Sequence, residues 1–142
     1  NRLQTLAQAL AVSDRVKWWG EYPDEDLPRR MADADFLVLP SVGTEEMFGM
    51  VLLEAMAARR PVITTAVPSG VREVNEAGVT GLEVPIRDAG ALAEAMRTLV
   101  DDHDLRERMG IAGRGRVQER FTVARMVDSH IELYRKVRGP KG

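Results

Sequence analysis

Short apolar runs alternate with helical patterns through most of the chain. The run at residues 36–39 is wholly apolar, which is typical of a strand covered on both faces in a parallel sheet. Strands alternating with helices through short connections form right-handed βαβ units. The pattern therefore predicts a Rossmann-like parallel sheet flanked by helices. The expected strands are residues 15–19, ending at Gly20, and residues 35–39, 61–65 and 81–85.

Helical spacing of apolar residues and capping residues predict the helices between and after these strands. Thr122 is expected to cap the final helix, and Asp104 the one before it. Asp24 or Asp26 should cap a short helix that has Pro28 in its first turn. Residues 67–73 form a loop leading into a helical turn. The expected helices are residues 2–12, a segment ending near 32, and residues 48–58, 89–100, 105–119 and 123–137.

The helix at residues 48–58 is the most informative element. It is almost entirely apolar and contains one charged residue, Glu54. A carboxylate in such a helix is costly to bury unless a partner compensates it. The helix follows a strand and a loop that carries Glu45 and Glu46, and such a loop is where α/β proteins bind anionic ligands.

Three loops should converge at the carboxyl edge of the sheet: residues 20–24, 40–48 and 66–73. The first backbone N–H groups of the helix have no intrahelical acceptor, and with the helix dipole they suit a phosphate. Gly49 would let a ligand approach the backbone closely. The expected phosphate-binding amides are those of Phe48, Gly49, Met50 and Val51.

Glu54 lies roughly 7–8 Å along the helix axis from those amides, at about 1.5 Å per residue. This is about the distance from the diphosphate of a nucleotide to its ribose, so Glu54 could accept two ribose hydroxyls. Glu46 could accept hydroxyls from a group beyond the phosphates. The pattern equally allows a structural interpretation, in which Glu45 and Glu46 favour the helix N-terminus and Glu54 pairs with an arginine.

Glu46 and Glu54, set in this context, closely resemble the E-x7-E motif of the family 4 glycosyltransferases, which have the GT-B architecture of two Rossmann-like domains. The resemblance continues through residues 61–64, 69–73, 78–85 and the final helices. It covers essentially the whole chain, as most of the C-terminal, donor-binding half. Isolated glutamates at this spacing would carry no information, but the embedded motif is specific.

The resemblance implies roles for these residues. Glu54 would hold the nucleotide ribose, Glu46 would approach the donor-sugar hydroxyls as the candidate catalytic residue, and the amides of residues 48–51 would bind sugar or phosphate. The implied reaction is sugar transfer from a nucleotide diphosphate sugar to a hydroxyl, with retention at the anomeric carbon and no metal or cofactor. The sequence of residues 40–54 and 69–75 is similar to that of bacterial polysaccharide mannosyl- and rhamnosyltransferases. This similarity favours GDP-mannose as the donor.

The chain departs from the family pattern in two ways. Arg59 stands where the family usually has glycine, which enters the left-handed region without strain. The Arg and Lys that clamp the diphosphate would lie before residue 1, as would the acceptor-binding domain. We therefore expect residues 1–142 to be a single nucleotide-sugar-binding domain, truncated at its N-terminal side and inactive alone. A saccharide or lipid-linked saccharide acceptor would bind through the missing domain.

Composition narrows the function further. A net charge of −2 argues against nucleic acid as the main partner, and the chain has no cysteine to form disulfides or thiolate metal sites. No apolar run is long enough to span a membrane. The resemblance implies a cytoplasmic protein, with peripheral attachment at the inner face of the membrane as an option.

Several other features are expected to be structural. Asp33 and Asp35 match a metal-binding DxD motif, but they precede a strand at the sheet edge opposite the ligand. Residues 101–104 could suggest a second metal site, but they lie between two helices. One of Trp18 and Trp19 should be core while the other borders the crevice. Residues 72–73 could contact the donor or form a structural turn. Two other functions remain open: a sugar-nucleotide epimerase of the same architecture, and a non-catalytic α/β binding or regulatory domain.

Overall fold

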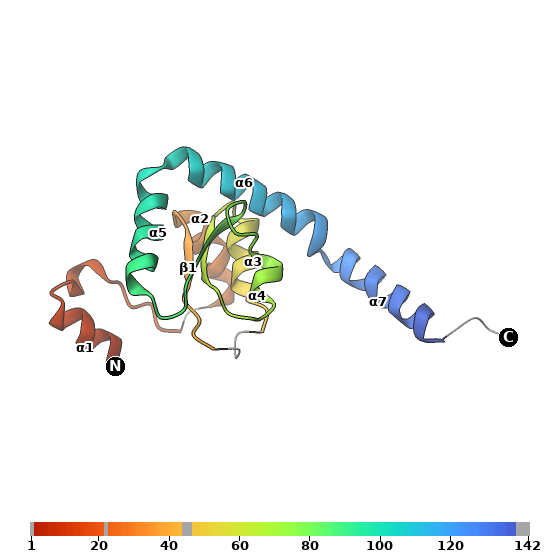
Figure 1. Cartoon of the computed structure of the whole chain (residues 1–142), viewed down its shortest axis with the longest axis horizontal. Helices are drawn as coiled ribbons and strands as arrows, with labels where there is room; N and C mark the ends of the chain where they lie inside the picture. The colour runs from red at the N-terminus through yellow and green to blue at the C-terminus, as the bar shows by residue number, and fades with distance from the viewer. Residues whose placement is uncertain (1, 22, 44–46, 139–142) are drawn as a thin grey trace.

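A parallel sheet lies at the centre of the computed structural model, which describes residues 2–21, 23–43 and 47–138. Its strands are in the order β1-β2-β3, with Val38 in register with Ile63, and Ile63 with Leu82. The predicted fold class, a Rossmann-like parallel sheet flanked by helices, is confirmed (Figure 1). The strands are β1 (Leu37–Leu39), β2 (Val62–Thr65) and β3 (Gly81–Val84).

Seven α-helices and two 3-10 helices are present in the described ranges. The α-helices are α1 (Arg2–Ala9), α2 (Leu27–Asp33), α3 (Met50–Ala57), α4 (Val71–Val74), α5 (Ala89–Asp101), α6 (His103–Arg120) and α7 (Val123–Arg138). The 3-10 helices are η1 (Ser13–Arg15) and η2 (Asp24–Asp26). All the helices predicted from the apolar spacing are confirmed.

Two hydrophobic clusters cover opposite faces of the sheet, because alternate residues of each strand point to opposite sides. On one face, Val62 packs with residues of α2, α3 and α4. On the other face, Ile63 and Val84 pack with α5 and the first half of α6. Every residue of β2 is buried, as expected for a central strand in a parallel sheet.

Helix α6 crosses α3 at close range, and two of its glycines make this possible. A Cβ at Gly110 would lie 2.2 Å from the carbonyl oxygen of Arg59, and one at Gly113 would lie 3.2 Å from Met56 Cγ. Glycine is unfavourable within a helix by about 1 kcal/mol relative to alanine. In α6 this local cost is offset by packing against α3, whose Leu52, Ala55 and Met56 are fully buried.

The predicted strand at residues 15–19 is wrong. Residues 13–15 form η1, Val16 N–H donates to Ser13 O, and the residues that follow have no regular structure. No described segment pairs with them, so they lack the ladder hydrogen bonds that define a strand. Trp18 and Trp19 are both exposed, contrary to the expectation that one is core, and the Arg30 guanidinium stacks 3.8 Å from the ring centre of Trp19.

The predicted caps are partly confirmed. Thr122 Oγ1 accepts from Arg125 N–H at the start of α7, and Pro28 lies in the first turn of α2. Asp26 occupies the N-cap position of α2 without a side-chain hydrogen bond. The cap of α6 is Asp102 and not Asp104, because Asp102 Oδ1 accepts from Leu105 N–H at 2.8 Å.

The outermost helices carry exposed apolar residues. Helix α7 extends away from the sheet and has no buried residue, although its apolar positions have the predicted helical spacing (Figure 1). In α1 only Ala7 is buried. None of the helices in the described residues combines the length and apolar character needed to cross a membrane.

The turn after α3 contains a strained residue. Arg59 has a φ of 60°, in the left-handed region where the family's glycine would sit without strain. Its side chain is exposed, so little packing is lost on truncation. The expected turn is therefore kept, and the arginine is accommodated at a conformational cost.

Replacing Arg59 with glycine should raise the free energy of unfolding by about 0.5–1 kcal/mol, because relief of left-handed strain exceeds the added entropy of the unfolded chain. Urea unfolding monitored by circular dichroism measures this change. Arg108→Gly, at an exposed position inside α6, is the control and should destabilise by about 1 kcal/mol. Equal destabilisation by both variants would contradict the presence of strain at Arg59.

Candidate functional site

The start of α3 lies beyond the carboxyl end of β1 and is shaped by Gly49. Gly49 occupies the N-cap position with φ 75° and ψ 58°, and its carbonyl accepts from Leu52 N–H at 2.8 Å. A Cβ at this position would lie 2.8 Å from Leu52 Cδ1. The sequence prediction emphasised ligand approach at Gly49. Positive φ and contact with Leu52 give an additional, structural reason for glycine.

The predicted phosphate-binding residues lie together at this helix start. Phe48 and Met50 are exposed, Val51 is half-buried and Gly49 is buried. First-turn N–H groups of an α-helix have no acceptor within the helix, and the positive end of its dipole is at the same place. This arrangement can accept an anion from the solvent side.

Glu54 is exposed, which corrects the expectation of a costly buried acid. It follows Met50 by one helical turn, so both side chains project from the same side of α3. The described residues contain no ion pair or hydrogen bond to its carboxylate, so the arginine partner of the structural interpretation is absent among them. The carboxylate is thus available to a ligand.

Glu54 lines a cavity of about 630 Å³ between η2, α2 and α3. The other lining residues come from two segments, and they are Asp24, Leu27, Pro28, Ala32, Ala57 and Ala58. The lining is mainly apolar, with Asp24 as the second carboxylate. A flat, partly apolar group with hydroxyls along one edge would match this chemistry.

Two of the three predicted loops meet directly at the carboxyl edge. Gly70 N–H donates to Met47 O at 2.8 Å, and Thr65 Oγ1 donates to Ser41 O. The first loop, residues 20–24, reaches the site through Asp24, which shares the Glu54 cavity. Glu46, the predicted catalytic residue, and Thr44 and Glu45 lie outside the described residues.

Arg72 belongs to the framework. Its Nε and Nη2 donate to Glu83 Oε2 and Oε1, each at 3.2 Å, which gives a two-pronged pair with β3. The carbonyl of Glu73 accepts from Arg116 of α6 at 2.8 Å. For Arg72 and Glu73, the structure therefore favours a role in a structural turn over contact with the donor.

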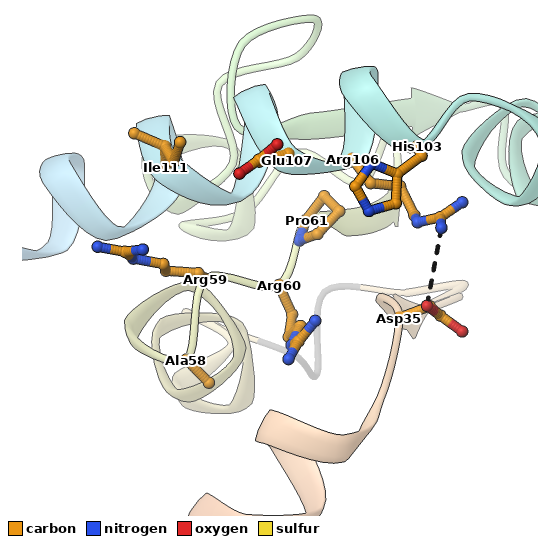
Figure 2. A pocket seen from close by; sticks show the side chains of 9 residues that line it. All are labelled: Asp35, Ala58, Arg59, Arg60, Pro61, His103, Arg106, Glu107 and Ile111. Carbon is orange, nitrogen blue, oxygen red and sulfur yellow. Dashed lines mark ion pairs between the residues drawn. The ribbon is translucent and has the colours of Figure 1, made fainter.

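A second cavity, of about 300 Å³, lies at the opposite edge of the sheet (Figure 2). Asp35 points toward Arg106, and the two charged groups are 3.9 Å apart. Arg106 also donates to the α5 carbonyl of Val100 at 2.7 Å. Asp35 of the DxD pattern is therefore an ion-pair partner, and the described residues contain no group of three or more possible metal ligands.

Sequence reasoning missed two residues at the site. Asp24 belongs to the predicted 20–24 loop, but its side chain was assigned only a capping role, although it lines the Glu54 cavity. Gly70 was one residue in a loop motif, and nothing in the sequence indicated its contact with Met47. The ring of Phe48 also meets that of Phe121 edge to face at 5.8 Å, a contact between residues far apart in the sequence.

The fold and this cleft define an α/β domain of the Rossmann-like class with its ligand crevice at the carboxyl ends of the strands. Residues 1–116 match the model of the family Glycosyl transferases group 1, and the chain belongs to that family. Its architecture is the C-terminal half of a GT-B glycosyltransferase.

Individual relatives agree with this assignment. O-antigen chain mannosyltransferase C of Escherichia coli is 36% identical over 128 residues, which is 90% of this chain and 34% of that protein. Sucrose-phosphate synthase from Thermosynechococcus elongatus superposes with a TM-score of 0.86 at 36% identity, covering 96% of this chain and 33% of its own. Anabaena Alr3699/HepE in complex with UDP has a TM-score of 0.86 at 26% identity, and the match covers 94% of this chain and 35% of the HepE chain. The chain thus spans about a third of the length of these relatives.

Gly49→Ala should destabilise the protein by about 1–3 kcal/mol, because positive φ and the Leu52 clash add. Gly78→Ala is the matched control: its φ is 81°, but an added Cβ would meet nothing within 4 Å. Thermal unfolding of both variants separates strain from packing. Equal losses of stability would show that Leu52 does not constrain the helix start.

Proposed function

We propose that this chain is the donor-binding domain of a retaining, family 4 glycosyltransferase that transfers a sugar from a nucleotide diphosphate sugar to a hydroxyl acceptor. The observation that carries the proposal is the carboxylate of Glu54, which has no ion-pair or hydrogen-bond partner among the described residues and is exposed in a cleft one helical turn beyond the N-terminus of α3. Family membership and the UDP complex of the HepE neighbour support a nucleotide as a ligand of this domain.

In the proposed binding mode, the diphosphate contacts the amides of residues 48–51 and the ribose hydroxyls donate to Glu54. The base would enter the apolar cavity beside Asp24. Amides at the helix start would stabilise the negative charge that grows on the leaving diphosphate, and such preorganised donors supply much of the rate enhancement in many enzymes. Glu46 would orient the donor sugar for attack by the acceptor hydroxyl.

We propose GDP-mannose as the donor, in line with the naming of the Escherichia coli relative as a mannosyltransferase. The acceptor would be a saccharide or lipid-linked saccharide bound by the rest of the protein, in the synthesis of bacterial surface polysaccharide. The protein would be cytoplasmic, with peripheral attachment to the membrane, and would need no metal or cofactor. Epimerase and non-catalytic functions are not favoured, because the named relatives include transferases.

Glu54→Gln and Glu54→Ala in the full-length enzyme should raise the donor KM by roughly 10- to 150-fold, the value of one or two hydrogen bonds to a charged acceptor. The acceptor KM should stay unchanged. Steady-state kinetics with both substrates measure this, and Glu94→Gln, on the exposed side of α5, is the matched control. Unchanged donor kinetics in the Glu54 variants would contradict the ribose assignment.

Calorimetric titration of the full-length protein with GDP, UDP and ADP should show GDP as the tightest ligand. A preference for UDP would contradict GDP-mannose as donor while leaving the site assignment intact. Absence of binding by all three nucleotides at millimolar concentration, with the fold intact by circular dichroism, would contradict the proposed function itself.

A further inference from the structure

The backbone of Gly70 lies closer to the loop that precedes α3 than the backbone of a residue with a Cβ could. Its N–H donates to Met47 O at 2.8 Å. A Cβ at position 70 would lie 2.5 Å from that same oxygen and 3.1 Å from Phe48 Cδ2. The backbone of Gly70 has φ −59° and ψ −10°, which any residue adopts. Glycine is therefore required here for space and not for conformation.

The segment that carries Gly70 is fixed on its C-terminal side. Asn75 Nδ2 donates to Thr64 Oγ1 at 2.9 Å and to Leu82 O at 3.1 Å, inside the sheet. The buried hydroxyl of Thr80 donates to Asn75 Oδ1 at 3.0 Å. A fully satisfied buried polar network of this kind resists displacement.

Helix α6 fixes the same segment from outside. The guanidinium of Arg116 donates to the carbonyls of Val74 and Glu73 at 3.0 and 2.8 Å, and pairs with Glu76 at 2.7 Å. The Arg116 side chain is only 14% exposed, although its bonds to Glu73 and Glu76 lie at the surface. The two anchors hold α4 and the residues leading into it against the sheet.

Within the described residues, the loop on the other side of the contact is held by the hydrogen bond from Thr65 Oγ1 to Ser41 O and by the ring contact of Phe48 with Phe121, and not by a buried polar network. Met47 is 78% exposed, and it lies between Glu46 and Phe48 in the sequence. An added methyl group at position 70 would therefore displace Met47 and Phe48 instead of α4. Any such shift would move the amides that open α3.

We infer that Gly70 is a positioning residue, which sets the Met47–Phe48 backbone at the distance that the sugar and phosphate of the donor require. This inference rests on the proposed function and assigns the 66–73 loop a task within it. The base and ribose would bind at the Glu54 cavity, which Gly70 does not line. Loss of the contact should therefore affect the sugar diphosphate part of the donor and spare the nucleoside part.

The test compares Gly70→Ala with Gly115→Ala in the full-length protein. Gly115 lies in α6, and an added Cβ there meets nothing within 4 Å, so this variant controls for a methyl group alone. Gly70→Ala should raise the Kd for GDP-mannose by roughly 10- to 100-fold, as expected for the loss of one hydrogen bond to a charged phosphate. The Kd for guanosine, and the values for Gly115→Ala, should stay within about twofold.

Equal weakening of guanosine and GDP-mannose binding, or no weakening of either, would overturn the positioning role. Failure of the unsubstituted protein to bind either ligand would overturn the proposed function itself. This failure can be told apart from failure of the positioning role, because it is measured without any variant. A second measurement does not depend on the folding of Gly70→Ala. In the unmodified protein, hydrogen exchange at the Gly70 amide should slow on addition of GDP-mannose and not of guanosine. An exchange rate that neither ligand changes would also overturn the role.

Discussion

Close packing of α3 between the sheet and α6 is the constraint on which the candidate site depends. Leu52, Ala55 and Met56 are fully buried, and α6 approaches so closely that glycine is required at position 110. These contacts fix the axis and rotation of α3. Because the apolar faces of the helix are committed to packing, the face that carries Met50 and Glu54 is the one left open to a ligand.

Much of the fold was predictable because the apolar pattern and the packing agree. Residues 62–65 are all β-branched and all buried, so local preference and burial favour the same strand. Residues 15–19 lack this agreement. Their sequence favours a strand, but a strand also needs a neighbour, and no described segment supplies the hydrogen bonds. Pairing is a property of two segments, so one segment's pattern could not decide it.

The candidate site was predictable in position and less so in environment. The helix start and the convergence of the loops follow from strand order and local geometry. The exposure of Glu54 does not, because burial depends on how α2 lies beside α3. The Met47–Gly70 contact was not predictable either. The deciding distance is between two backbones, so the pattern of side chains does not indicate it.

The central claim is that a nucleotide sugar binds along the exposed face of α3, with its ribose at Glu54. A crystal structure of the full-length protein with GDP-mannose or its GDP product tests this most directly. We predict ribose hydroxyl oxygens within about 2.6–3.2 Å of the Glu54 carboxylate, with phosphate oxygens at the amides of residues 48–51. A nucleotide bound elsewhere, such as in the cavity lined by Asp35 and Arg106, or one whose ribose does not reach Glu54, would contradict it.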